Sequence, residues 1–211
     1  MRTKPLRIAV FASGSGTNFQ AIANAVQEGR LDARIELLVC DRPQAEVVER
    51  ALNAGIPVHA FKPKDYPSRE AYEQEILSML QEKGVELVVL AGYMRIITSV
   101  LVDAYWGRMI NIHPSLLPSF PGLHAVRQAL EHGVKVTGVT VHLVDGGLDS
   151  GPILAQRTVD IEPEDTEQSL SEKIHPIEHV LYPQVIQAIA EGAIDLKQAA
   201  HHKTKDGMIV Q

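Results

Sequence analysis

Residues 7–18, RIAVFASGSGTN, join an apolar run to a turn of small residues and decide how the fold begins. The run at 7–12 predicts a strand that is buried on both faces. The turn at 13–16, SGSG, leads into a helical pattern from Asn18 to about Glu28, which Gly29 ends. A strand, a glycine turn and a helix in this order predict the start of a parallel α/β sheet.

The same alternation continues to residue 113. It predicts further strands at residues 35–40, 58–61, 86–91 and 109–113, and helices at residues 45–53 and 69–83, the latter capped by Ser68. Apolar strands joined by helices indicate a doubly wound, mostly parallel, Rossmann-like sheet that is covered on both faces.

The pattern changes after residue 113. Three prolines and a glycine between residues 114 and 122 predict a stiff irregular loop. The expected elements beyond it are a short helix at 124–132 and an antiparallel pair of strands at 136–144 and 153–161. A long C-terminal helix at 166–191 closes the fold. Because Pro176 and Pro183 lie inside it, we expect a kink, a late start or a break there.

The composition is that of a globular, net acidic chain. The 211 residues are 45% apolar and 22% charged, and 20 Lys and Arg against 26 Asp and Glu give a formal net charge of −6. This balance argues against a nucleic-acid-binding protein, and the longest apolar stretches, such as residues 87–94, are too short to cross a membrane. We expect no signal peptide, and the single Cys40 favours a reducing, cytoplasmic compartment.

The first candidate site is the loop Gly14-Ser15-Gly16-Thr17-Asn18 at the strand-to-helix junction. Small residues let the backbone approach a ligand, and the free N–H groups of a helix N-terminus attract an anion such as a phosphate. A dinucleotide site is the alternative, with Asp41 as its ribose ligand, but the third glycine of that motif would fall at Phe19. The loop therefore favours a phosphate ligand over NAD, and a purely structural turn stays open.

The second candidate is Asn111-Ile112-His113 at the end of a predicted strand. Side chains two residues apart share one face, so Asn111 and His113 point together at the edge where parallel sheets bind ligands. An amide donor beside an imidazole suits carbonyl chemistry, because one stabilises an oxyanion and the other moves a proton. The alternative is a buried histidine with a structural asparagine.

The third candidate is the loop GGLDSG at residues 146–151. Glycines around one carboxylate allow close approach to a ligand, and Asp149 would raise the pKa of His113 if the two met. An ordinary hairpin loop is the alternative.

A zinc site is not expected. Residues 175–179, HPIEH, formally match an H-x-x-E-H motif. However, Pro176 lies between the would-be ligands and no third acidic ligand is marked. His201 and His202 lie in a polar tail and are expected to be solvated.

Five segments together resemble the formyl-folate transferase family over residues 7 to about 191. They are SGSGTN at 13–18, AGYMRII at 91–97, INIHPSLLP at 110–118, PGLH at 121–124 and LDSGPI at 148–153. The glycine loop, with Glu178-His179 in the last helix, is similar to the branch of the family that acts on glycinamide ribonucleotide.

The resemblance implies transfer of a formyl group from 10-formyltetrahydrofolate, a consumed co-substrate, to the amine of glycinamide ribonucleotide in purine biosynthesis. It implies small-molecule substrates, no metal, no NAD, and a monomer or homodimer. It also implies one formyltransferase domain over residues 1–200, with a nucleotide-binding half at about 1–105 and a folate-binding half at about 106–200. Residues 201–211 would form a polar tail.

The resemblance also implies roles residue by residue. Asn111 would donate to the developing oxyanion and His113 would move the proton, while Asp149 would orient His113 and keep its pKa high enough for the protonated form to serve. The ribonucleotide and its phosphate would be bound by Gly16, Thr17, Asn18, His175, Pro176, Ile177 and Glu178. The folate would be bound by Arg69, Met94, Arg95, Ile96, Ile97, Asn111, Asp145, Gly146, Gly147, Leu148 and Asp149.

Other functions stay open. A formyltetrahydrofolate hydrolase or another formyl-folate transferase would share the same core. An NAD-dependent oxidoreductase would explain the glycine loop and Asp41, but it would leave Asn111, His113 and the 146–151 loop without a role.

Overall fold

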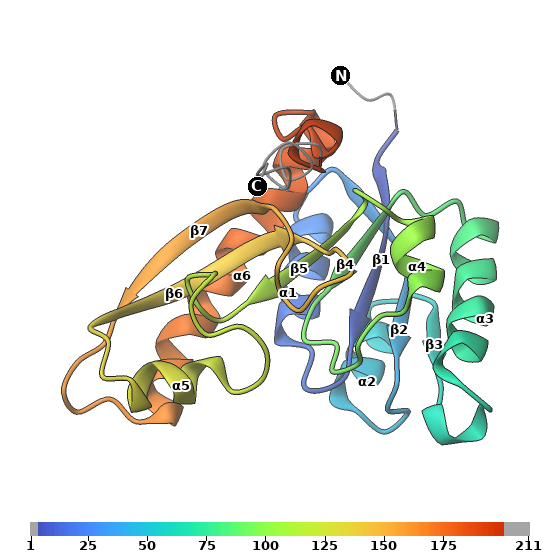
Figure 1. Cartoon of the computed structure of the whole chain (residues 1–211). Helices are drawn as coiled ribbons and strands as arrows, with labels where there is room; N and C mark the ends of the chain where they lie inside the picture. The colour runs from blue at the N-terminus through green and yellow to red at the C-terminus, as the bar shows by residue number, and fades with distance from the viewer. Residues whose placement is uncertain (1–3, 201–211) are drawn as a thin grey trace, which may run out of the picture.

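One seven-stranded sheet runs through the computed structural model, which describes residues 4–200 (Figure 1). The strands are β1 (Leu6–Ala12), β2 (Ala33–Cys40), β3 (Val58–Ala60), β4 (Leu87–Leu90), β5 (Met109–His113), β6 (Val136–Leu143) and β7 (Ile153–Asp160). Their spatial order is β3-β2-β1-β4-β5-β6-β7. The first five strands pair in parallel, whereas β6 is antiparallel to both β5 and β7. The predicted mixed α/β architecture is confirmed.

The helices lie close to their predicted bounds. They are α1 (Thr17–Gln27), α2 (Glu46–Asn53), α3 (Arg69–Glu82), α4 (Ser99–Ala104), α5 (Ala125–Glu131) and α6 (Glu167–Glu191), with a 3₁₀ turn η1 (Pro63–Asp65). The side chain of Ser68 caps α3, as predicted. We did not predict α4 or η1, because six and three residues are too few for a helical period to show.

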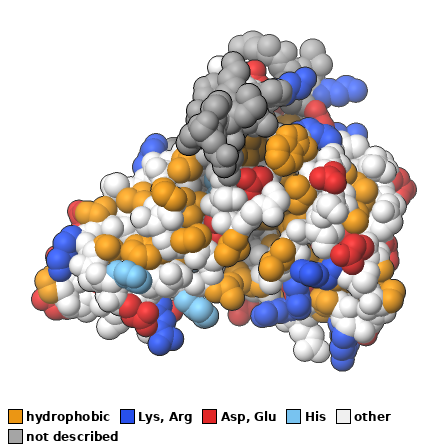
Figure 2. Space-filling view, in the orientation of Figure 1, with side chains coloured by type: hydrophobic (Ala, Val, Ile, Leu, Met, Phe, Trp, Pro, Cys, Tyr) orange, Lys and Arg blue, Asp and Glu red, His pale blue; other side chains and the backbone are white. Residues whose placement is uncertain are grey.

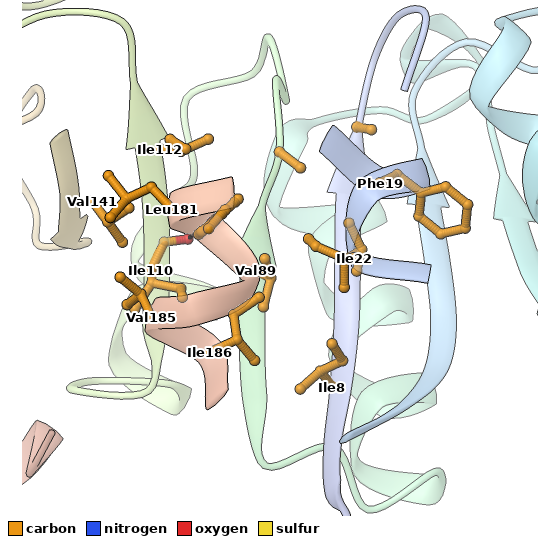
Figure 3. Packing of buried hydrophobic residues seen from close by; sticks show 14 of the residues in the cluster. Ile8, Phe19, Ile22, Val89, Ile110, Ile112, Val141, Leu181, Val185 and Ile186 are labelled. Atoms are coloured by element: carbon orange, nitrogen blue, oxygen red, sulfur yellow. Dashed lines mark hydrogen bonds between the residues drawn. The ribbon is translucent and has the colours of Figure 1, made fainter. Parts of the chain in front are cut away.

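Successive residues of β1 point into two separate hydrophobic layers. Ile8 and Val10 pack with α1, α2, α5 and α6 on one face of the sheet. Ala9 and Phe11 pack with α3 and α4 on the other. Figure 3 shows the first layer, where side chains of α1 and α6 meet those of β1, β4, β5 and β6. Burial on both faces explains the unbroken apolar run of residues 8–12.

The expected late start or break in the last helix is wrong, because α6 continues from Glu167 to Glu191 through Pro176 and Pro183. Each proline removes one backbone hydrogen bond, which costs about 3 kcal/mol in a helix interior. Tertiary packing offsets that cost, since α6 buries ten side chains against the sheet and α1. The hydroxyl of Tyr182 also donates to Leu90 O at 2.7 Å and lies 3.2 Å from Ile110 O, which holds α6 across β4 and β5.

The chain changes direction across the sheet between β1 and β4. From β1 it proceeds outward through β2 to β3, and from β4 it proceeds the other way through β5 to β7. Open α/β sheets bind ligands in the crevice at such a switch point, beyond the carboxyl ends of the strands. In Figure 1 this is the lower edge of the sheet, below β1 and β4.

Candidate active site

The glycine loop closes the amino end of α1 at this switch point. Gly16 is the N-cap, with a φ of 74°, and a Cβ there would collide with the side chain of Val47. Both facts require glycine, so the turn is specified by backbone geometry. The loop is also tied to the segment after β4, because Ser13 N donates to Gly92 O and Met94 N donates to Ser13 Oγ.

Asn18, in the first turn of α1, reaches across to α6. Its Nδ2 donates to Glu178 Oε2 at 3.0 Å, although the two residues are 160 positions apart. Glu178 is buried, and burial raises the pKa of its carboxyl against the effect of the Asn18 amide, which lowers it. Asn18 Oδ1 and His179 Nε2 are buried and have no protein partner in the described part of the chain. A ligand with polar groups would satisfy these atoms.

The other predicted residues of α6 lie beside Glu178. His175 and Pro176 are exposed and Ile177 is half-buried. The rings of His175 and His179 stack with their centroids 6.3 Å apart. His179 was not predicted as a site residue, and its place one position after Glu178 was the available signal.

Asn111 and His113 meet Asp149 at the end of β5. Asn111 Nδ2 lies 3.5 Å from Asp149 Oδ1, and His113 Nδ1 lies 3.5 Å from Asp149 Oδ2. The structure therefore brings the three residues together, as the strand spacing and the resemblance had led us to expect.

The loop after β6 aims Asp149 at this cluster. Asp149 has a φ of 48°, which is unusual for a residue with a side chain, and its Oδ2 accepts from Gly122 N at 2.7 Å. Asp145 instead accepts from Gly147 N and Ser150 Oγ within the loop. The predicted loop residues thus divide into Asp149, which faces the cluster, and Asp145, which holds the loop in shape.

Asp149 raises the pKa of His113, as expected, but burial of the ring lowers it by more. Burial lowers the pKa of His113 below 6.5, and this outweighs the Phe120 carbonyl and the Asp149 carboxylate, which both raise it. His113 Nε2 lies 2.8 Å from Phe120 O, so the neutral ring carries its proton on Nε2 and donates it there. Because the pKa is lowered, the neutral ring is favoured near pH 7 in the ligand-free structure.

His142 completes the cluster and was missed in the sequence. It lies on β6 directly opposite Asn111, and its Nε2 is 3.2 Å from Asn111 Nδ2 and 3.6 Å from Asp149 Oδ1. The His142 ring lowers the pKa of Asp149 to about 2, although burial of the carboxyl opposes the shift. The antiparallel register of β5 and β6 would have revealed this residue, but we had predicted pairing only between β6 and β7.

The segment after β4 starts next to the strand that carries Asn111, because Leu90 at the end of β4 pairs with Asn111 on β5. Met94, Arg95 and Ile96 are exposed on it, with Met94 at 56% and Ile96 at 70% of their full accessibility. Leu148, in the loop that carries Asp149, is 64% exposed. Apolar side chains held open beside a polar cluster indicate a ligand surface.

A buried carboxylate holds the far end of this segment. Both Oε atoms of Glu73, on α3, accept from Thr98 N at 3.0 and 3.1 Å, and Thr98 Oγ1 donates to Oε2 at 2.6 Å. Glu73 is 1% exposed, and burial raises the pKa of its carboxyl. Arg69, one turn earlier on α3, is exposed and makes no contact with the cluster in the described structure.

The described residues contain no group of three or more His, Cys, Asp or Glu side chains that could hold a metal ion. The 175–179 motif in particular places Glu178 against Asn18. The two tail histidines, His201 and His202, lie outside the described residues. No described helix has the length and apolarity that a membrane crossing requires.

The formyl transferase family model matches residues 6–186, which include every element of the site. The chain belongs to the formyl transferase family. Within it, the chain is 52% identical over 183 residues to phosphoribosylglycinamide formyltransferase of Bacillus subtilis, covering 87% of this chain and 94% of that one.

Solved structures of the family have the same fold. Glycinamide ribonucleotide transformylase 1 from Geobacillus kaustophilus superposes with a TM-score of 0.86 at 54% identity, over 88% of this chain and 99% of that one. Phosphoribosylglycinamide formyltransferase from Bacillus halodurans gives a TM-score of 0.86 at 54% identity, over 89% and 97%.

Proposed function

We propose that this protein is a phosphoribosylglycinamide formyltransferase, which moves the formyl group of 10-formyltetrahydrofolate to the amine of glycinamide ribonucleotide. The observations that carry the proposal are the meeting of Asn111, His113 and Asp149 at the end of β5 and the Asn18–Glu178 pair that joins α1 to α6. The Asn111, His113 and Asp149 cluster suits chemistry at a carbonyl carbon. The Asn18–Glu178 pair suits binding of a polar molecule that accepts the formyl group. The names of the similar proteins agree with this pairing.

The ribonucleotide would lie between α1 and α6. The N–H groups of Gly16, Thr17 and Asn18 at the start of α1 would bind its phosphate. Asn18 Oδ1, which has no protein partner, and the Glu178 carboxylate would accept from its hydroxyl and amine groups. Residues 175–177 would border it on α6. This arrangement points the amine toward the end of β5.

The folate would occupy the opposite side of the cluster. Residues 94–97 and 145–149 form the two loops that face it, with the exposed Met94, Ile96 and Leu148 as apolar contacts for the pteridine. Arg69 and Arg95 would meet the acidic end of the molecule. The formyl group would then lie beside Asn111, between the two substrates.

The reaction would proceed by addition and collapse. The amine nitrogen attacks the formyl carbon, and Asn111 Nδ2 donates to the oxygen as negative charge develops on it. Neutral His113 accepts a proton from the attacking nitrogen and returns it to N10 of the folate as the C–N10 bond breaks. Asp149 orients the ring and stabilises the imidazolium that forms in between.

This mechanism requires a change at His113. Nε2 is bonded to Phe120 O and Nδ1 faces Asp149, so neither ring nitrogen is open to a substrate. Substrate binding would have to replace the Phe120 carbonyl at Nε2 and shift the ring proton to Nδ1, from which it would be donated to Asp149. Asp149 would then hold the His113 ring at Nδ1, while Nε2 exchanges a proton with the substrates.

We further propose one formyltransferase domain over residues 1–200 in which both halves of the chain contribute to each substrate site. The ribonucleotide would touch residues 16–18 of the first half and Glu178 of the second, and the folate would touch residues 94–97 and Asp149 in the same way. The protein would act in the cytoplasm as a monomer or homodimer on small molecules, and light scattering tests the oligomeric state.

A formyl-transfer assay with and without glycinamide ribonucleotide tests the function. Formylated ribonucleotide and tetrahydrofolate should appear in equal amounts, and only when the amine is present. Formate release without the amine would instead indicate a hydrolase. Transfer to a different amine would indicate another formyl-folate transferase, and turnover with NADH would indicate an oxidoreductase.

A further inference from the structure

A row of three side chains extends from His113 across the antiparallel part of the sheet. His113 on β5 pairs with Thr140 on β6, and Thr140 pairs with Gln156 on β7. Directly opposite residues of antiparallel strands point to the same face, so Thr140 and Gln156 lie on the face that carries His113. The proposed reaction gives neither residue a role, although Thr140 is fully buried and Gln156 is half-buried.

The two outer side chains of this row hold the chain that leaves β5. Gln156 Nε2 donates to Leu117 O at 3.0 Å and to Thr140 Oγ1 at 2.9 Å. Thr140 Oγ1 accepts from Leu117 N at 3.0 Å and donates to Ser115 O at 2.6 Å. Ser115 Oγ in turn donates to Ser119 O at 2.6 Å. Side chains of β6 and β7 therefore bond both backbone polar groups of Leu117, and the bonds continue along the segment.

Strand β6 also has room for this chain at a glycine. A Cβ added at Gly138 would lie 2.6 Å from Leu116 Cδ2 and 2.1 Å from Arg157 O, so glycine allows the close approach of Leu116. In Figure 1 the segment after β5 passes over β6 on its way to α5, and Figure 2 shows hydrophobic side chains gathered over β6 and β7. Packing as well as hydrogen bonding thus anchors the segment.

The anchored segment, residues 115–122, contacts both members of the acid–base pair formed by His113 and Asp149. Phe120 O accepts from His113 Nε2 at 2.8 Å. Gly122 N donates to Asp149 Oδ2 at 2.7 Å. A shift of the segment would therefore change the polar contacts of both groups at once.

We propose that Gln156 is a positioning residue for formyl transfer, because its side chain holds the 115–122 segment against the acid–base pair. The proposal rests on the function proposed above. Without Gln156, Leu117 O loses its donor, and since Leu117 is 4% exposed, water replaces that donor poorly. The segment then shifts, Asp149 orients the His113 ring less well, and the rate of proton transfer falls.

Two variants remove these hydrogen bonds with little change in side-chain volume. Gln156→Met removes the amide, and Thr140→Val removes the hydroxyl. Each should lower kcat about tenfold, the effect of one lost buried hydrogen bond, while KM for either substrate changes by less than about twofold. Thr140→Ser keeps a hydroxyl and should recover most of the kcat that Thr140→Val loses.

A control variant on the same strand separates positioning from stability. Val159 is buried on the opposite face of β7, in the hydrophobic layer that contacts α6. Val159→Ala removes two methyl groups, so it should lower the free energy of unfolding about as much as the loss of a buried hydrogen bond. Its kcat should nevertheless stay native.

The titration of His113 in the ligand-free protein gives a readout that is independent of turnover. The Phe120 carbonyl and the Asp149 carboxylate raise the pKa of His113, whereas burial and the His142 ring lower it. A loosened segment weakens the first two contacts, so the NMR midpoint of the ring should fall further in Gln156→Met. In the β7 control variant the midpoint should not move.

The outcomes distinguish the possible roles of Gln156. A native kcat or a native His113 midpoint in folded Gln156→Met would overturn the proposal, because the side chain would then contribute to stability alone. Equal changes in Val159→Ala would also overturn it. If Gln156→Met does not fold, Thr140→Val decides by the same two measurements. Absence of formyl transfer in the native protein would instead contradict the proposed function, and the His113 midpoints would still test the positioning role.

Discussion

His113 and Asp149 face each other at the end of β5, with Nδ1 of the ring 3.5 Å from Oδ2 of the carboxylate. Strand β5 positions His113, and the glycine-rich loop after β6 positions Asp149. Asp149 is also held by Gly122 N at 2.7 Å, so the carboxylate is positioned before any substrate arrives. Such preorganisation is what a group that orients a catalytic base requires.

Burial and the Asp149 carboxylate act on the pKa of His113 in opposite directions, and a titration of the ring should show both effects. Because burial dominates, the midpoint of the His113 ring should lie below 6.5 in the ligand-free protein. Asp149→Asn removes a charge that favours the imidazolium, so the midpoint should fall further. NMR titration of the ring measures both values. A midpoint above 6.5, or a rise in the Asp149→Asn variant, would contradict the electrostatics described here.

The depressed pKa of Asp149 should also appear in the stability of the protein. A carboxyl with a pKa of about 2 instead of 3.8 stabilises the fold above its ordinary pKa, and this stability is lost as pH falls through about 2. The contribution is about 2 kcal/mol. Urea unfolding should therefore show Asp149→Asn to be less stable than the native protein at pH 7 by about this amount, with the gap closing near pH 2. The same gap at both pH values would show that charge is not the cause.

Glycinamide ribonucleotide should protect the start of α1 from hydrogen exchange. The amides of Gly16, Thr17 and Asn18 are the proposed phosphate ligands, so saturating substrate should slow their exchange at least several-fold. The amide of Gly29, at the other end of α1, provides the internal reference. Unchanged exchange at residues 16–18 under saturation would remove the phosphate assignment.

Glu178 should act on binding of the ribonucleotide more than on the chemical step. Glu178→Gln keeps the size of the side chain but removes the buried charge that Asn18 holds. We expect KM for the ribonucleotide to rise about 10- to 100-fold, the effect of a charged hydrogen bond, with little change in KM for the folate. Glu172→Gln, at an exposed position on the same helix, is the matched control. A selective rise in KM for the folate would contradict this assignment, because it would place Glu178 at the folate site.

Glu73 should position the segment after β4, residues 93–98, through its hydrogen bonds to Thr98. Glu73→Gln turns one acceptor oxygen into an amide NH₂ group that cannot accept from Thr98, so the end of the 93–98 segment should loosen. KM for the folate should rise several-fold while KM for the ribonucleotide and kcat stay near native values. Glu82→Gln, at the exposed end of α3, controls for the loss of charge. An equal change in both KM values would indicate general destabilisation instead.

Local patterns predicted most of the fold. The strand β1, the glycine turn and α1 follow from period, small residues and cap preferences, and the alternating runs at β6 and β7 predicted their antiparallel pairing. Length set the limit: α4 has six residues and shows no period. Pro176 and Pro183 misled because proline rules describe an isolated helix, whereas α6 is held by its buried face and by Tyr182.

Site residues that lie on one strand could be predicted from the sequence. Site residues that meet only through pairing between strands could not. Asn111 and His113 are two residues apart on β5, so their common face follows from strand geometry. His142 joins them only because β6 pairs with β5 in a particular register, which no local pattern specifies. The lowered pKa of His113 depends on burial, which the residue type alone does not give.

The central claim is that Asn111, His113 and Asp149 act together on one carbonyl carbon, and the rate of formyl transfer under saturating substrates tests it most directly. His113→Ala and Asp149→Asn should each lower kcat about 10²- to 10⁴-fold, the usual contribution of a positioned acid–base group. Asp160→Asn, on the exposed edge of β7, should turn over like the native protein. Near-native kcat in either site variant, with the protein folded and both substrates bound, would contradict the account.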